Sequence, residues 1–187
     1  YTQSIFTALT NLHLNNLLPI RLDGATKEFF AWGLRVGFLT FGINDDATKN
    51  VLEAKVKGLI RSNISSGPLP SQSAIKYVLE NHETFDKEIQ HNMETLQARY
   101  EVTKEVVYAD KYTKFWQPYD FNSGYFMALQ VKGVDPEALR IHLIDNYSIG
   151  IIALNDTDIR IAFSCVEKDD IPHVFDSIAQ GIDDLQE

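Results

Sequence analysis

The chain has 187 residues, of which 44% are hydrophobic, and its formal net charge is -9, so it is long and apolar enough to bury a sizeable core. The acidic balance argues against nucleic acid or an anionic membrane as the main partner, because both favour net positive charge. No apolar run approaches the ~20 residues of a membrane-spanning helix, and neither an export signal nor an internal repeat is evident.

The first predicted element is a helix, because Ile5, Phe6, Leu9 and Leu12 recur at helical spacing. The chain opens at Tyr1 without Met and reads like the interior of a domain. We therefore expect the sequence to be a fragment of a longer protein.

Two strands and a helix are expected next. Residues 17–23 form a short strand-like run that Gly24 ends, which places Lys27 on a loop at the end of a strand. Residues 34–42 are almost continuously apolar, as in a strand buried on both faces, and this strand would contain Arg35. Asn44, Asp45 and Asp46 can cap a helix over residues 47–60, and this order is typical of α/β architecture.

A Ser-, Pro- and Gly-rich joint over residues 62–72 precedes two helices, at about 72–80 and 83–106. The second helix carries apolar residues at steps of three and four, which indicates a stripe packed on a core.

The remaining residues predict a compact α+β unit. It contains a strand over 125–131, a helix opened by Asp135 and Pro136, a hairpin of strands 149–153 and 159–165, and a final helix over 169–185. Cys165, the single cysteine, lies in an apolar run and is expected to be a small buried hydrophobe. One cysteine forms no internal disulfide, and a reducing cytoplasm is the simplest compartment for such a chain.

Lys27 is the first candidate for chemistry. A lysine is ordinarily a solvated surface residue, but small residues precede this one and Phe29, Phe30 and Trp32 follow it. Apolar neighbours can desolvate an amine, which lowers its pKa and yields the neutral nucleophile that a Schiff-base lysine needs.

Arg35 lies between Gly33 and Gly37, eight positions after Lys27. Its planar fork can bind a phosphate through two parallel hydrogen bonds, the glycines let a ligand approach the backbone, and Thr26 can add a hydroxyl donor. An amine beside a phosphate clamp indicates a phosphorylated aldehyde cofactor.

These two segments, GATK (24–27) and GLRVG (33–37), resemble the lysine motif of the class I/II aminotransferases, the fold-type-I enzymes that use pyridoxal 5′-phosphate (PLP). The chain departs from the family pattern at Gly24, which is often serine, and at Phe30, which is usually small or aliphatic. The resemblance implies that Lys27 holds PLP through a Schiff base, and that Arg35 and Thr26 bind its phosphate.

The same resemblance implies roles for Arg160 and Gly124. From the residues alone, an arginine in an apolar strand needs an anionic partner or solvent, and a structural salt bridge would satisfy it. In the family, an arginine in this C-terminal strand receives the substrate α-carboxylate, and Arg160 takes that place. Gly124, in FNSGYF, matches the glycine that borders the substrate, although an ordinary turn glycine is the alternative.

Arg61 matches the position from which aspartate aminotransferases read a side-chain carboxylate across the dimer interface, and an interface ion pair is the alternative. Arg61 hints at a dicarboxylate substrate, whereas Phe115, Trp116 and Tyr119 hint at an aromatic pocket. The five histidines lack metal-ligand spacing, so no metal is expected.

By this resemblance, residues 1–68 belong to the C-terminal part of the large α/β PLP-binding domain, and 69–187 comprise the interdomain helix and a small α+β domain. The parent protein is expected to be a cytoplasmic homodimer that exchanges amino groups between an amino acid and a 2-oxo acid. The family's aspartate at the pyridine nitrogen and its ring-stacking aromatic lie upstream of Lys27 and cannot be placed in this sequence. The isolated chain is therefore expected to be inactive and to bind PLP weakly or not at all.

Two alternatives stay open. Another fold-type-I enzyme, such as a C–S β-lyase, would share the lysine and both arginines. An aminotransferase-like sensor domain of a transcription regulator would share the fold.

Overall fold

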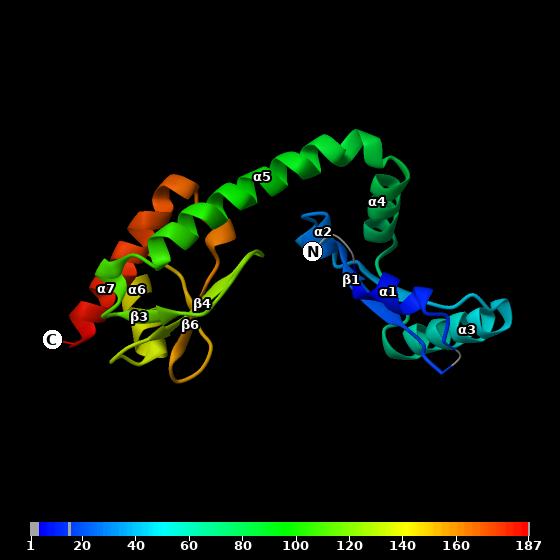
Figure 1. Cartoon of the computed structure of the whole chain (residues 1–187), viewed down its shortest axis with the longest axis horizontal. Coiled ribbons are helices and arrows are strands. Elements are labelled where there is room, and N and C mark those ends of the chain that lie inside the picture. Colours follow the sequence, from blue (N-terminus) through cyan, green and yellow to red (C-terminus); the bar gives the residue numbers. More distant parts are fainter. Residues whose placement is uncertain (1–3, 15, 187) are drawn as a thin grey trace. The chain divides into compact units, whose positions relative to one another are not determined.

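The computed structural model describes residues 4–14 and 16–186, which form two compact units (Figure 1). Unit 1 is Tyr1–Ile89 and unit 2 is Gln90–Glu187. The boundary falls later than the 68/69 division that the Ser-, Pro- and Gly-rich joint suggests. The helix after the joint belongs to unit 1, because its Ile75 is buried and lines a cavity with residues 35–38. The assignment of residues 1–68 and 69–187 to the family's domains stays a prediction.

Unit 1 is built around a two-stranded antiparallel hairpin. Strand β1 (Ile20–Gly24) pairs with β2 (Gly37–Phe41), with Gly24 opposite Gly37. The expectation of a strand buried on both faces is wrong, because β2 carries only exposed and half-buried residues and, within the described part of the chain, pairs with β1 alone. An antiparallel hairpin can leave faces uncovered, whereas a central strand of a parallel sheet cannot.

The other elements of unit 1 are helical. They are α1 (Ile5–Asn11), α2 (Ala25–Glu28), the 3₁₀ turn η1 (Trp32–Leu34), α3 (Asp46–Asn63) and α4 (Leu69–Glu80). Asp45 caps α3 as expected, since its carboxylate accepts a hydrogen bond of 2.7 Å from Thr48 N–H. Among the described residues of unit 1, only Ala25 and Ile75 are buried hydrophobics, so unit 1 has little core of its own.

Helix α5 (His82–Val107) begins in unit 1 and continues through the first part of unit 2. Unit 2 then contains a four-stranded antiparallel sheet in the order β3-β4-β6-β5. The elements after α5 are, in chain order, η2 (Asp110–Tyr112), β3 (Trp116–Pro118), β4 (Met127–Val131), α6 (Pro136–Tyr147), β5 (Ile152–Ala153), β6 (Asp158–Ile161), η3 (Phe163–Cys165), η4 (Lys168–Asp170) and α7 (Ile171–Gln186).

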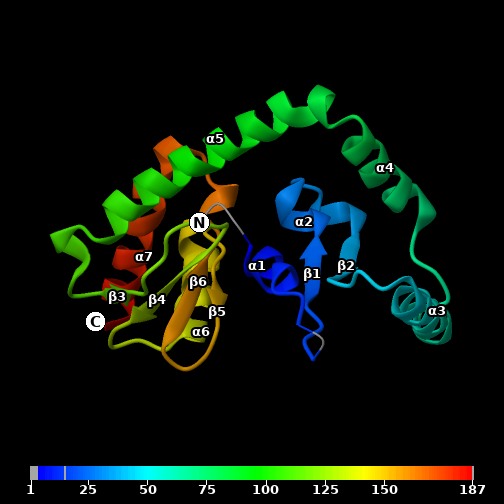
Figure 2. The same cartoon turned by 45° about the vertical axis from the view of Figure 1, so that its right-hand side comes forward.

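One face of this sheet carries the core. Met127, Leu129 and Val131 alternate with exposed and half-buried residues along β4, as the period of a strand requires. Helices α6 and α7 pack together on the same core, and Figure 2 shows them beside the sheet. The core is joined by the buried aromatic side chains of Tyr112, Phe115, Trp116, Phe163 and Phe175.

The expectation that Cys165 is buried is wrong, because its side chain is exposed. Strand β6 ends at Ile161 rather than at 165, and the chain then turns through η3. The alternation of the strand therefore stops before Cys165, and Phe163 takes the buried place instead.

Candidate active site

Lys27 and Arg35 lie at the same end of the β1–β2 hairpin. The connection between the strands, residues 25–36, is closed at its base by the Gly24–Gly37 pair. A hydrogen bond of 3.0 Å from Ala25 N–H to the carbonyl of Val36 also closes it. Lys27 lies three residues after the end of β1, and Arg35 lies two residues before β2 begins. The spacing of eight residues is therefore the length of a closed loop, which keeps both side chains near one strand end.

Lys27 itself lies in the short helix α2, not in an extended loop. Lys27 is exposed, so Phe29, Phe30 and Trp32 do not bury it as the sequence led us to expect. Thr26, directly before it, is half-buried. The neighbouring Glu28 pairs with Arg21 at 3.6 Å.

Arg35 lies outside the strand in which the sequence placed it. Its φ of 54° puts it in the left-handed region, where it ends η1, and Nη1 donates a hydrogen bond of 3.2 Å to the carbonyl of Trp32. A non-glycine residue with this backbone is uncommon and costs about 1 kcal/mol or more, so the turn selects against an arginine on conformational grounds alone. Such strain is typical of functional sites.

Arg35 also lines a cavity of about 480 Å³ with residues of α3, α4 and β2, and neither Thr26 nor Lys27 lines it. The structure thus places Thr26, Lys27 and Arg35 in one loop at the end of the hairpin without enclosing them in one pocket. An amine for an aldehyde, with a guanidinium and a hydroxyl for a phosphate, is a donor set that fits PLP.

Arg160 lies in the middle of β6, opposite Ala128 of β4 and Ile152 of β5. Its guanidinium lies over the ring of Phe126, with Cζ 4.6 Å from the ring centroid. Among residues 4–14 and 16–186, no carboxylate lies within ion-pair distance of Arg160. The structural salt bridge that would have explained this arginine is therefore not found in the described chain.

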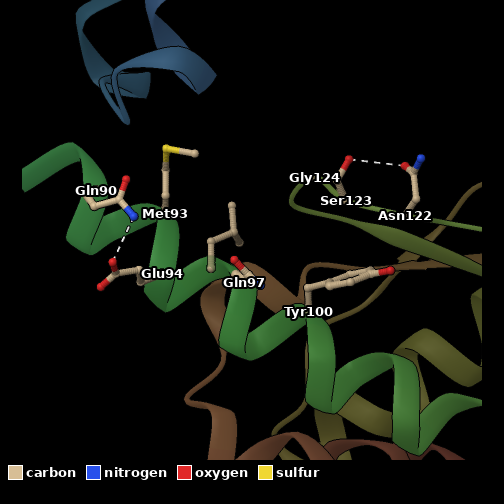
Figure 3. Close-up of a pocket in the computed structure, with 9 residues that line it drawn as sticks. Gln90, Met93, Glu94, Gln97, Tyr100, Asn122, Ser123 and Gly124 are labelled. Carbon is tan, nitrogen blue, oxygen red and sulfur yellow. Dashed lines mark hydrogen bonds between the residues drawn. The ribbon is translucent and has the colours of Figure 1, made fainter. Parts of the chain in front are cut away.

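Gly124 lies in the bend before β4 with a φ of 96°, so a turn glycine is required at this position. It lines a pocket of about 370 Å³ between α5 and residues 122–124, with Tyr100, Gln97 and Met93 on the helix side (Figure 3). Arg160 does not line this pocket, so the structure does not join these two predicted substrate contacts in one cavity.

Arg61 ends up on the surface. It lies in the last turn of α3, and its Nη1 donates a hydrogen bond of 2.6 Å to Oγ of Ser65. That local contact shapes the turn after α3 and leaves the prediction of a substrate or interface role untested.

Sequence reasoning missed Arg99. Its guanidinium donates to the carbonyl of Ser164 at 2.5 Å and to Oε1 of Glu167 at 2.8 Å. The helical pattern of α5 gives no signal for it, because a charged residue beside an apolar stripe ordinarily faces solvent.

Across the described residues, no helix is long and apolar enough to cross a bilayer, and no group of three His, Cys, Asp or Glu side chains is placed to hold a metal ion.

Several solved structures share this fold. An aminotransferase from Mycobacterium tuberculosis aligns with a TM-score of 0.72 at 16% identity, covering 98% of this chain and 45% of its own. An aminotransferase from Anaerococcus prevotii aligns with a TM-score of 0.70 at 21% identity, covering 89% of this chain and 39% of its own. A kynurenine aminotransferase from Pyrococcus horikoshii, in complex with PMP, aligns with a TM-score of 0.69 at 14% identity, covering 90% of this chain and 41% of its own. The chain thus spans less than half the length of each of these proteins.

None of the curated proteins matches the sequence. The family model for aminotransferases of class I and II, whose cofactor is pyridoxal phosphate, matches residues 13–178. That match covers most of the chain and agrees with the fold of the solved structures. The chain therefore belongs to the class I and II aminotransferases.

Proposed function

We propose that this chain is part of a PLP-dependent aminotransferase that exchanges an amino group between an amino acid and a 2-oxo acid. The observation that carries the proposal is the closed hairpin end, which holds Lys27, Thr26 and Arg35 within one short excursion. The family match adds the reaction class.

Each residue has a separate task in this proposal. The Lys27 amine binds the cofactor's aldehyde carbon and, when released, moves the proton at the substrate α-carbon. Arg35 and Thr26 bind the phosphate through charge-assisted and hydroxyl hydrogen bonds. The bound pyridine ring supplies an electron sink, which is the chemistry that side chains lack.

Arg160 is proposed to bind the substrate α-carboxylate. A guanidinium offers five N–H donors in one plane, which matches a carboxylate with two parallel hydrogen bonds. Since no carboxylate of the described chain lies within ion-pair distance of Arg160, the fork is available for this role. Gly124 is proposed to border the substrate, and Arg61 to read a side-chain carboxylate across a homodimer interface.

The 187-residue chain alone is proposed to be inactive. Unit 1 has little buried core among its described residues, and Lys27 is exposed. We place the active form in a longer, cytoplasmic, homodimeric protein that contains these residues.

The test begins with this chain. After it is mixed with PLP and treated with borohydride, we expect little or no stable adduct at Lys27 by absorbance and peptide mapping. A stable Lys27 adduct accompanied by turnover would contradict the prediction of inactivity.

The second arm uses the longer protein. Borohydride should fix PLP on the peptide that contains Lys27, the Lys27→Ala variant should lose that label, and Lys49→Ala should keep it. With an amino-acid donor and a 2-oxo acid acceptor, the donor should become its 2-oxo acid and the acceptor its amino acid, without release of ammonia. Release of pyruvate and ammonia would instead identify a β-lyase, and an absent label would overturn the assignment of Lys27.

A further inference from the structure

Arg99 is an arginine that the proposed chemistry does not use and that is largely buried. Its side chain is 18% exposed, and Nε is buried with no hydrogen-bond partner among the described residues. Its two terminal nitrogens hold Ser164 and Glu167, more than sixty positions along the chain. Burial of a cation is costly unless the cation is paired and hydrogen-bonded. The contacts with Ser164 and Glu167 therefore offset the cost of burying the Arg99 guanidinium. It joins α5 to the segment that directly follows β6.

That segment is connected to the start of β4. The backbone N–H of Ser164 donates a hydrogen bond of 3.4 Å to the carbonyl of Tyr125. Strands β4 and β6 are antiparallel, with Met127 opposite Ile161 and Ala128 opposite Arg160. The peptide that Arg99 holds is therefore next to the residue that precedes Phe126.

Phe126 and Arg160 lie on one face of the sheet. Phe126 precedes Ala128 by two residues, so the two share a face, and Ala128 lies directly opposite Arg160. Diagonal neighbours of this kind are within reach of aromatic and long side chains. The distance of 4.6 Å from Arg160 Cζ to the ring centroid shows that the contact is made. Attraction between the cation and the ring limits the positions open to the guanidinium.

We propose that Arg99 is a positioning residue for Arg160. By holding Ser164 and Glu167 against α5, Arg99 fixes the peptide beside Tyr125, and thereby the Phe126 ring that carries the guanidinium of Arg160. The role of Arg160 toward a substrate carboxylate rests on the proposed function. The positioning of Arg160 does not rest on that function, because all the contacts that connect Arg99 to Arg160 lie within unit 2 and involve no cofactor.

The test follows the side-chain N–H signals of Arg160 by NMR in the full chain labelled with ¹⁵N-arginine. Groups over the face of an aromatic ring are shifted upfield, so the Phe126→Leu variant should move the Arg160 signal downfield and calibrate the effect. Arg160→Lys assigns the signal by removing it.

Arg99→Met is expected to move the Arg160 signal in the same direction as Phe126→Leu, and Arg99→Lys to move it less, because lysine can keep one of the two contacts. Arg140→Met is the matched control. It removes an arginine of the same unit that pairs with Glu137 at 2.6 Å on α6, and it should leave the Arg160 signal in place.

An unchanged Arg160 signal in folded Arg99→Met overturns the proposal. If Arg99→Met does not fold, the Glu167→Gln variant tests the proposal instead. It keeps Arg99 and weakens only the contact between Arg99 and the exposed Glu167 carboxylate. A small downfield shift then supports the proposal, and no shift overturns it. Failure of Lys27 to bind PLP would refute the proposed function but would not alter this result.

Discussion

The ring of Tyr112 stacks on the ring of Trp116, with centroids 4.6 Å apart and 24° between the planes. Both side chains are buried, and the indole N–H of Trp116 donates a hydrogen bond of 3.2 Å to the carbonyl of Val107 at the end of α5. Phe175 of α7 lies 5.9 Å from the Trp116 ring, so one aromatic group joins α5, β3 and α7. The stability of unit 2 should depend strongly on it.

Trp116→Ala is expected to destabilise unit 2 by about 3–5 kcal/mol, because it removes a large buried side chain and leaves a cavity. Trp32→Ala is the matched control, since Trp32 is 74% exposed and its loss should change the free energy of unfolding by less than about 0.5 kcal/mol. Urea unfolding followed by circular dichroism measures both. Equal losses in the two variants would contradict the packing described for Trp116.

Asp184 is expected to lose its low pKa when Tyr147 loses its hydroxyl. The Tyr147 hydroxyl, 2.6 Å from Oδ2, together with Gln180 and His142, lowers the pKa of Asp184 from 3.8 to about 2. Tyr147→Phe removes the largest of these effects, so the titration midpoint of the Asp184 carboxyl should rise. A ¹³C-detected carboxyl titration gives the value. Tyr119→Phe, which removes a hydroxyl bound to Asp158, should leave the Asp184 midpoint unchanged.

The sign of the pH effect follows from that shift. A carboxyl whose pKa is lowered on folding stabilises the fold above its unfolded value of 3.8, and this contribution is lost as the pH falls toward about 2. The difference in unfolding free energy between the wild type and Tyr147→Phe should therefore shrink over that range. A difference that grows as the pH falls would contradict the assignment.

Gly181→Ala is expected to destabilise unit 2. A methyl group at Gly181 would lie 2.8 Å from Cδ2 of Leu143 and 3.4 Å from Cδ1 of Leu139, both fully buried. Overpacking of this kind costs about 1–3 kcal/mol, more than the gain of up to about 1 kcal/mol from helix propensity. Gly58→Ala in α3 meets no atom within 4 Å, so it should stabilise unit 1 by about 0.5–1 kcal/mol. Thermal unfolding should show opposite signs, and a stabilised Gly181→Ala would refute the close packing of α6 on α7.

Asp135→Ala should shorten or fray α6. The Asp135 carboxylate accepts a hydrogen bond of 2.7 Å from Ala138 N–H, and loss of such a cap costs about 1 kcal/mol. Asp135→Ser should restore most of the stability, because serine can accept the same bond. Amide hydrogen exchange of residues 137–139 measures the effect, and equal protection in the Asp135→Ala and Asp135→Ser variants would contradict it.

The long and periodic elements were predictable from the sequence, and the short ones were not. Helix α5 follows from its apolar stripe, and the caps Asp45 and Asp135 follow from residue type. Strand β3 was missed because its three residues end in Pro118, and a proline lowers strand preference outside edges. The start of β2 was misplaced because Arg35 adopts a left-handed backbone that its residue type does not favour.

For the site, the sequence identified residue types but not their surroundings. The hairpin closes the segment that contains Lys27 and Arg35 into one loop, and their shared role in binding PLP stays a prediction. The exposure of Lys27 and the Phe126 ring under Arg160 could not be predicted, because both depend on contacts between distant segments. Arg99 could not be recognised for the same reason, as its partners lie beyond four further strands and helix α6.

The hydrogen bond from Ala25 to Val36 has a consequence for sequence variation in relatives of this chain. A shift of the β1–β2 pairing would move Lys27, which follows β1, relative to Arg35, which precedes β2. One residue inserted between them would also change their separation, even while the strands stayed paired. The length of this loop and the register of the two strands thus together set the separation of Lys27 and Arg35. Functional relatives should tolerate many substitutions in this excursion and very few insertions or deletions.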